Sequence, residues 1–128
     1  MAVALGVALG GCSLGADEEA PPASGEASRV ARAIDRLERA SAAGDHALIC
    51  RELLTAAAVE RAGGRDCARL MRSSARGIEA PSIQVRSIAV EGERATVEVV
   101  TRARGQGPVD DRIELRRGEG GWRIEGLG

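Results

Sequence analysis

The chain has 128 residues, a length that allows one small domain. Its formal net charge is −1 and all 18 of its cationic side chains are arginine, most of them near acids, so no basic field is available to attract nucleic acid. Hydrophobic residues make up 44% of the sequence, but Trp122 is its only aromatic residue. We therefore expect a core of aliphatic side chains with little bulk, in a domain small enough to gain from a covalent staple.

An unbroken apolar run occupies residues 2–11. A helix of that length is too short to cross about 30 Å of hydrocarbon, but the run suits the hydrophobic region of a signal peptide. The positively charged segment that normally precedes such a region is missing, which favours an upstream start codon or a shortened chain. Residues 1–11 are therefore interpreted as a signal peptide.

The apolar run ends in Leu9-Gly10-Gly11-Cys12, which resembles the bacterial lipobox. The resemblance implies cleavage before Cys12, a diacylglycerol thioether on its sulfur and an acyl chain, such as palmitate, on its amino group. Two or three such chains anchor a protein stably, because each buried CH₂ contributes about 0.8 kcal/mol. The alternative is an ordinary secretory leader that contains a cysteine. We expect a protein lipid-anchored to the cell membrane on its extracytoplasmic face.

The segment after the cysteine is acidic and rich in proline, with Asp17, Glu18 and Glu19 followed by Pro21-Pro22. Low hydrophobicity, proline and like charges favour a disordered tether. The chain is thus predicted to consist of a signal peptide at 1–11, a lipidated cysteine and tether at 12–27, and a folded domain at 28–128.

Helical periodicity dominates the first half of the predicted domain. Ser28 is the expected N-cap of a first helix that Gly44 stops, and Asp45 caps a second helix that runs through Leu54. A weaker helical stretch continues to the Gly63-Gly64 pair, and a third helix, capped by Asp66, covers residues 67–77. The apolar positions of these helices are Val30, Ile34, Leu37, Leu48, Ile49, Leu53, Leu54, Cys67, Leu70 and Met71.

Alternating apolar residues dominate the second half and predict strands. Ile83 and Val85 alternate, and Ile88 and Val90 resume one step out of phase, which a bulge near Ser87 would explain. Further alternating stretches follow, separated by a turn at 91–93, a longer loop at 103–108 and a tight turn at 118–121. Helices first and an antiparallel meander after them indicate an α+β fold, with the helices on one sheet face.

This order of elements resembles the nuclear transport factor 2-like (NTF2-like, or SnoaL-like) superfamily. Its members often end in a Gly-x-Trp-x-Ile/Val strand, a pattern that Trp122 and Ile124 fill in GGWRIEGL. The stretch IDRLERASAAGDHALICRELL is similar to the first two helices of the family, and the whole chain resembles small lipoproteins of this superfamily from GC-rich bacteria. Over residues 28–128 the resemblance implies three N-terminal helices packed on a curved antiparallel sheet, a cone that holds a pocket or dimerises through its sheet.

Two cysteines, Cys50 and Cys67, remain in the predicted domain. An even pair in an exported protein favours a disulfide, and closing this loop is worth about 3 kcal/mol on the chain-entropy model. Metal binding by this pair would need further ligands, and His46 is the only histidine of the sequence. His46 lies four residues before Cys50, but a thiol in a disulfide is not a nucleophile.

Catalytic candidates are few. Asp111 matches the apolar parity of its strand and could act as a base, alone or paired with Asp110, although two adjacent acids also suit a solvated strand end. Asp45 with His46 could form a base pair at a helix start, although Asp45 alone suits an N-cap. Enzymes of this superfamily combine a carboxylate with Tyr, His or Asn, and this chain contains no Tyr and no Asn.

The sequence therefore favours a non-catalytic NTF2-like domain that binds a small apolar ligand or a partner protein at the cell envelope, with no cofactor and no metal. Two alternatives stay open. The first is a cyclase- or isomerase-type enzyme with a carboxylate base. The second is a structural envelope module that forms a homodimer through its sheet.

Overall fold

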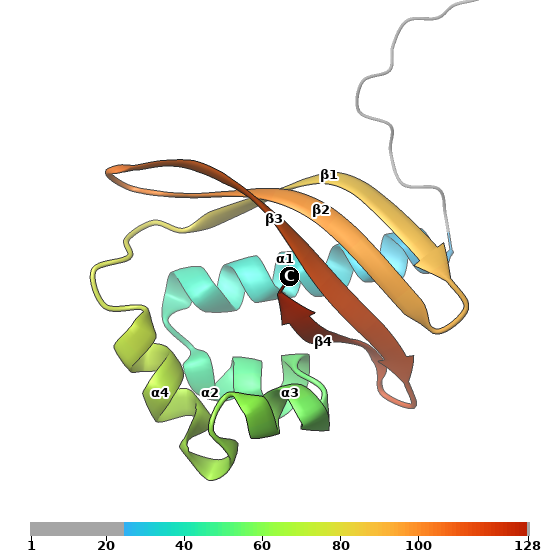
Figure 1. Ribbon diagram of the computed structural model, residues 1–128, viewed down its shortest axis with the longest axis horizontal. Helices are drawn as coiled ribbons and strands as arrows, with labels where there is room; N and C mark the ends of the chain where they lie inside the picture. The colour runs from blue at the N-terminus through green and yellow to red at the C-terminus, as the bar shows by residue number, and fades with distance from the viewer. Residues whose placement is uncertain (1–24, 128) are drawn as a thin grey trace, which may run out of the picture.

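The computed structural model describes residues 25–127, so the predicted signal peptide, Cys12 and nearly all of the tether lie outside the described residues. Over this range, one long helix and several short ones cover one face of a curved four-stranded antiparallel sheet of order β1-β2-β3-β4 (Figure 1). The α+β architecture predicted from the order of elements is confirmed. None of the helices between residues 25 and 127 is long and apolar enough to cross a membrane.

The helical half contains four α-helices rather than the expected three. They are joined in part by a π-helical turn, Ile49–Leu53, and a 3₁₀ turn, Gly64–Asp66. The α-helices are α1 (Glu26–Ala43), α2 (His46–Leu48), α3 (Ala56–Arg61) and α4 (Cys67–Ser74).

The stretch that was predicted to continue the second helix is interrupted at Leu54. This residue is extended, with φ −100° and ψ 153°, and forms a parallel bridge with Ile124 of the last strand. The N–H of Thr55 donates to the carbonyl of Ile124 at 2.9 Å, and the Thr55 hydroxyl accepts from the N–H of Ala58 at 3.1 Å. A tertiary contact with the sheet thus ends one helix, and Thr55 caps the next.

The first helix begins at Glu26, before the expected N-cap Ser28, and the predicted stop at Gly44 is confirmed by its left-handed backbone at φ 72°. Glu26 explains the early start, because its carboxylate accepts from the indole N–H of Trp122 at 2.6 Å. It also pairs with Arg117 at 3.1 Å and Arg29 at 2.8 Å. The indole hydrogen bond, followed by the two arginines, lowers the pKa of Glu26 below its ordinary value of 4.5.

The sheet consists of β1 (Ser82–Glu91), β2 (Arg94–Ala103), β3 (Gln106–Gly118) and β4 (Gly121–Leu127). The predicted bulge is confirmed, since the register between β1 and β2 shifts between Val85 and Ser87. The loop expected at 103–108 is instead a short turn, because Gly105 takes φ 79° and Gln106 already pairs with Ala103. The hairpin of β2 and β3 is therefore longer than predicted and reaches past the helices (Figure 1).

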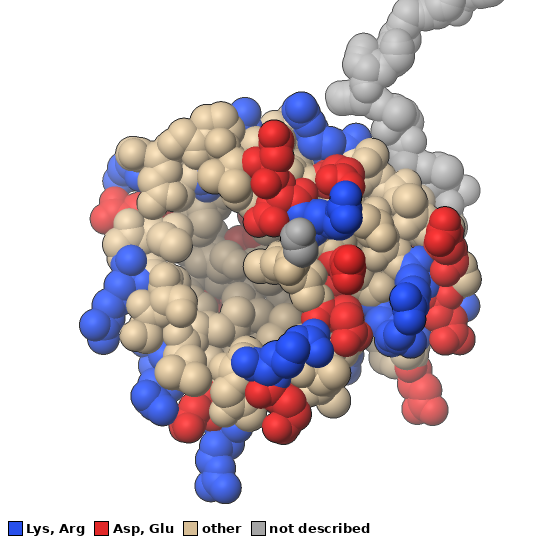
Figure 2. Space-filling model, viewed as in Figure 1, with Lys and Arg blue, Asp and Glu red and all other residues tan. Residues whose placement is uncertain are grey.

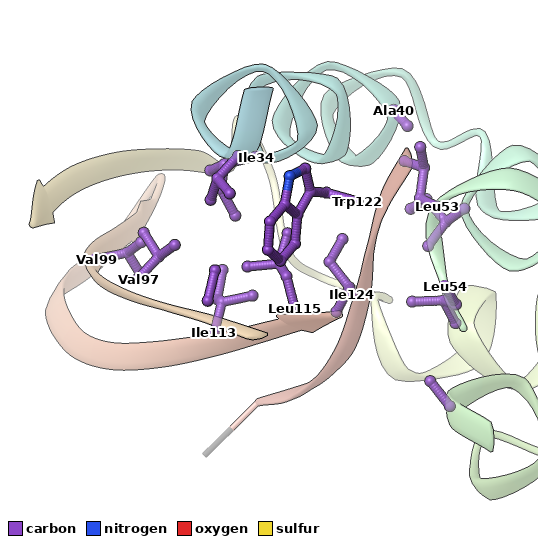
Figure 3. Packing of buried hydrophobic residues seen from close by; sticks show 14 of the residues in the cluster. Ile34, Ala40, Leu53, Leu54, Val97, Val99, Ile113, Leu115, Trp122 and Ile124 are labelled. Carbon is purple, nitrogen blue, oxygen red and sulfur yellow. The ribbon is translucent and has the colours of Figure 1, made fainter. Parts of the chain in front are cut away.

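The core lies between α1 and the sheet. Figure 3 shows Ile34 of α1 facing Trp122, with Ile113, Leu115 and Ile124 around the indole ring. Trp122 is 8% exposed, and Arg117 stacks over its ring at 5.8 Å from the centroid. Trp122, the only aromatic residue of the sequence, therefore fills the space between α1 and β4. The side chains that surround it in the core are aliphatic.

Candidate functional site

A cavity of about 580 Å³ opens between the helices and the helix-covered face of the sheet. Figure 2 shows it as a hollow whose visible wall is largely uncharged, with arginine and acidic side chains distributed over the surface around it. Its volume lies within the range of known small-molecule sites, which are typically lined by apolar side chains and a few polar groups. Among the described residues, this cavity is a candidate ligand site.

Both layers of the fold contribute to the wall. The helical side is built by Leu37, Glu38, Ser41, His46, Ile49, Ala62, Leu70, Met71 and Ser74. The sheet side is built by Ser82, Ile83, Thr101, Arg102, Ala103, Gln106, Gly107, Val109, Asp111, Ile113 and Leu127, and the connection between α4 and β1 adds Ala75, Ile78 and Pro81. No aromatic ring is among these residues, because Trp122 packs in the core instead.

Large apolar side chains remain exposed around this cavity. Leu70 is 40% exposed, Ile78 43%, Val109 52% and Leu127 66%, and all four line it. Elsewhere in residues 25–127, Val85 is the one other large hydrophobic residue with comparable exposure. Single exposed hydrophobic residues need no explanation, but a group around one hollow indicates a binding surface.

Asp111 lies on the cavity wall, where its strand parity with Ile113 places it. It is half-buried, and its Oδ1 accepts from the N–H of Arg112 at 3.0 Å. No ion pair to it occurs within residues 25–127. Asp110 does not line the cavity and is exposed, because successive residues of a strand face opposite sides of the sheet. Of the two candidate acids, Asp111 is therefore the one that lies at the cavity, on the opposite face of the strand from Asp110.

His46 also lines the cavity, but Asp45 does not. The Asp45 carboxylate accepts from the N–H of Leu48 at 3.1 Å, so it is the N-cap of α2 rather than the partner of a base. The imidazole Nδ1 of His46 is buried and has no hydrogen-bond partner within residues 25–127. The structure thus shows Asp45 in the N-cap position that also suited it in the sequence, and His46 lines the same cavity as Asp111.

Glu38 is a site residue that the sequence analysis did not predict, because Asp35, Arg36 and Arg39 around it make this part of the helix look like a charged, solvated face. It is half-buried and lines the cavity, and its Oε2 accepts from the N–H of Ile83 at 2.7 Å. A weak signal was present in the spacing, since Glu38 follows the buried Ile34 by four residues and therefore lies one turn above it. The hydrogen bond joins α1 to β1 at the cavity.

The disulfide between Cys50 and Cys67 lies behind the α4 wall. The pairing is the one expected from the two cysteines of the predicted domain. Met71, which lines the cavity, has its thioether sulfur 3.5 Å from the sulfur of Cys50 and 4.0 Å from that of Cys67. Cys67 is the only buried residue of α4, so the disulfide holds a helix that contributes little else to the core.

A second, smaller cavity of about 430 Å³ is lined by residues of the four strands. Its wall is dominated by charged side chains, and Arg116 and Glu125 pair across it at 3.7 Å. Exposed ion pairs of this kind contribute little to affinity or stability. The larger cavity is therefore the better candidate.

The site offers carboxylates but few partners for carbon-acid chemistry. A base needs a hydrogen-bond donor aimed at the same substrate oxygen. The sequence contains neither Tyr nor Asn, so the donors on this wall are His46, Arg102 and the hydroxyl and amide groups of Ser, Thr and Gln side chains. Within residues 25–127 no three His, Cys, Asp or Glu side chains cluster in a way that could hold a metal ion. The arrangement has the space and the apolar lining to enclose a small molecule, with carboxylates placed to contact a polar group on it.

The sequence matches no protein-family model and no curated protein. Several solved structures have a fold similar to that of this domain. An NTF-2 like protein of unknown function from Silicibacter pomeroyi aligns with a TM-score of 0.59 and 20% identity, over 78% of this chain and 90% of that one. A protein from Kribbella flavida aligns with a TM-score of 0.59 and 17% identity, over 80% and 87% of the two chains.

A third structure, a SEC-C motif containing protein from Rhodopseudomonas palustris, aligns with a TM-score of 0.55 and 20% identity, over 78% of this chain and 84% of that one. Identities this low say nothing about activity and bear on architecture alone. Helices on one face of a curved, unclosed antiparallel sheet, a cavity between the two layers and these neighbours lead to one conclusion. The domain has an NTF2-like fold.

Proposed function

We propose that this protein is a membrane-anchored lipoprotein of the extracytoplasmic face, whose NTF2-like domain binds a small apolar ligand without catalysis. The observation that carries the binding proposal is the cavity of about 580 Å³, with its predominantly aliphatic wall and its exposed apolar mouth. A pocket of this kind binds by burying apolar area, and its few polar groups orient the ligand.

A cavity-filling variant tests the binding proposal. Ala75 lines the cavity at the end of α4, so Ala75→Phe places an aromatic ring in the space that a ligand would occupy. Ala42 is exposed in the last turn of α1 and does not line the cavity, so Ala42→Phe is a matched control. Native mass spectrometry of protein extracted from membranes should show a retained small molecule in the parent and in Ala42→Phe, and loss of it in Ala75→Phe.

Two results would contradict this proposal. One is a parent protein that is free of any small molecule and binds no apolar probe. The other is an equal ligand load in both phenylalanine variants. An empty dimer in the same spectrum would favour the structural dimerisation module instead.

The anchoring proposal rests on Leu9-Gly10-Gly11-Cys12 and needs a separate experiment. Metabolic labelling with an alkyne fatty acid should label the parent and leave Cys12→Ser unlabelled, and fractionation should move the variant out of the membrane. Ser13→Ala is the control, because it leaves the cysteine in place. Equal labelling of parent and Cys12→Ser, or no labelling of either, would exclude the lipid anchor.

A cyclase- or isomerase-type activity is the second candidate, because Asp111 and His46 line one cavity. Asp111 would act as the base on an apolar substrate. Asp111→Asn would then abolish turnover while ligand binding persists, and Asp110→Asn would leave turnover unchanged. A bound molecule recovered chemically unaltered from the parent, in the same form as from Asp111→Asn, would favour binding without catalysis.

A further inference from the structure

We infer that the cavity accepts an aliphatic chain that ends in a protonated amine, an inference that rests on the binding function proposed above. Three features of the site carry it. They are the aliphatic character of the wall, the continuation of that wall onto the surface, and the charges that line it.

The wall favours a flexible chain over a ring system. Its apolar residues are Leu, Ile, Val, Ala, Pro and the thioether of Met71, with no aromatic ring among them. Aromatic ligands gain from stacking or edge-to-face contacts with aromatic side chains, and this wall cannot supply them. Methionine and branched aliphatic side chains instead adapt to a chain that takes several conformations.

The mouth of the cavity is also lined by aliphatic side chains, and these reach the protein surface. Leu70 and Ile78 approach from the α4 side, and Val109 and Leu127 from the ends of strands β3 and β4. All four are more than one third exposed, so apolar area continues from the cavity to the surface. A chain longer than the cavity would cover these side chains, and every methylene that it buries there strengthens binding.

The charges of the wall select the head group. Glu38 from α1 and Asp111 from β3 line the cavity from the two layers, and no ion pair involves either of them within residues 25–127. Each carboxylate accepts one backbone N–H, from Ile83 and Arg112 respectively, which leaves a second oxygen for a ligand.

The arginine of the wall does not reverse this field. Arg102 is exposed, and its guanidinium donates to the side-chain oxygen of Gln84 at 2.9 Å. A carboxylate head would therefore meet two like charges in a partly desolvated site, whereas an ammonium offers three donors to two acceptors. The site is complementary to a cationic or strongly donating head.

A matched set of small molecules tests both parts of the inference on the folded full-length chain. Decylamine, decanol and decanoic acid share a chain and differ in the head, and 1-naphthylmethylamine keeps the amine on a flat aromatic body. Isothermal titration calorimetry below the aggregation concentration of each probe should rank decylamine first. Decanoic acid should bind at least about tenfold more weakly, the effect expected from losing a charge-assisted hydrogen bond.

Variants assign the head-group preference to a residue. Asp111→Asn should weaken decylamine about tenfold and leave decanol within about twofold, because the lost contact is charge-assisted. Asp110→Asn removes the neighbouring charge from outside the cavity and should change neither. Equal losses in the two variants would mean that the amine responds only to the overall charge of the protein, and the inference would be wrong.

The remaining outcomes separate the inference from the proposed function. If decanoic acid or 1-naphthylmethylamine binds as tightly as decylamine, the head group or the chain has been misassigned, but the cavity still binds ligands. If no probe binds and Ala75→Phe changes nothing, the binding function fails together with the inference.

Discussion

The two ends of the space between helices and sheet are built from the same kinds of residue and differ in how they are filled. At the closed end, defined by α1, β4 and Trp122, side chains such as Val30, Ile34 and Leu115 are almost fully buried. At the cavity end, defined by α4 and the mouth of the cavity, Cys67 is the only buried residue of the helix, and Leu70 and Ile78 are exposed. The closed end is a packed hydrophobic core, and the other end encloses the cavity.

The two ends differ because the chain has too few large side chains to fill both of them. The sequence contains one aromatic residue, and it fills the closed end, where its indole N–H reaches Glu26. No second large ring is available for the opposite end, so the layers there enclose space, and a disulfide rather than packing holds α4. A small domain can maintain a cavity when a covalent link replaces part of the hydrophobic core.

The largest effect should come from opening the closed end. Trp122→Ala leaves a void in the centre of the core and should lower the free energy of unfolding by about 3–5 kcal/mol. Chemical denaturation followed by far-UV circular dichroism measures the free energy of unfolding and does not depend on tryptophan fluorescence, which this variant lacks. Trp122→Phe keeps most of the ring and should cost clearly less. A small loss in Trp122→Ala would show that the closed end is not the main source of stability.

Removing the disulfide should act on the cavity end. The double variant Cys50→Ala, Cys67→Ala should lose about 3 kcal/mol of stability, as expected for a loop of this length. Hydrogen exchange should show that residues 67–74 lose protection while β2 and β3 keep theirs. Uniform loss of protection in all elements would contradict the division into two ends, because it would mean that they unfold as one unit.

The cap of α2 should have a moderate effect that is separate from binding. Asp45→Ala removes the acceptor for the N–H of Leu48 and should cost about 1 kcal/mol, whereas Asp45→Asn can still cap and should be near neutral. Thermal unfolding of the two variants measures the difference. Since Asp45 does not line the cavity, ligand binding should be unchanged in Asp45→Asn, and a specific loss there would restore Asp45 as a site residue.

The smallest effect should be a pH dependence located at the closed end. The pKa of Glu26 is lowered in the folded state, so its contribution to stability is present above its ordinary value of 4.5 and is lost as the pH falls through the folded-state pKa. Denaturant unfolding of parent and Glu26→Gln should therefore show a difference at neutral pH that narrows in acid. A difference that is independent of pH would mean that the carboxylate charge is not involved.

Much of the fold could be predicted from local patterns. Periodicity indicated the helical half and the meander, the phase change predicted the bulge between Val85 and Ser87, and Gly44 predicted the end of the first helix. The break at Leu54 was missed, because a backbone bridge to Ile124 causes it. The short turn at Gly105 was also missed, since the pairing of two long strands selected it over a loop.

For the site, strand parity was enough to select Asp111 over Asp110, because side chains alternate between the faces of a strand. The role of Glu38 could not be predicted in the same way. Its helix presents a broad polar face, and only the approach of β1 converts that position into a wall residue that binds the N–H of Ile83.

The amino-acid sequence by itself determined the order of elements, the even pair of cysteines and the shortage of aromatic bulk, because these depend on residue identity and on spacing along the chain. The tertiary structure decided which part of the interior is left unfilled by this lack of large side chains. Trp122 joins Glu26, 96 residues away, at the closed end, and the space that it leaves unfilled lies under α4. Such a division depends on which surfaces meet across the fold, and periodicity within one helix or strand carries no information about its distant neighbours.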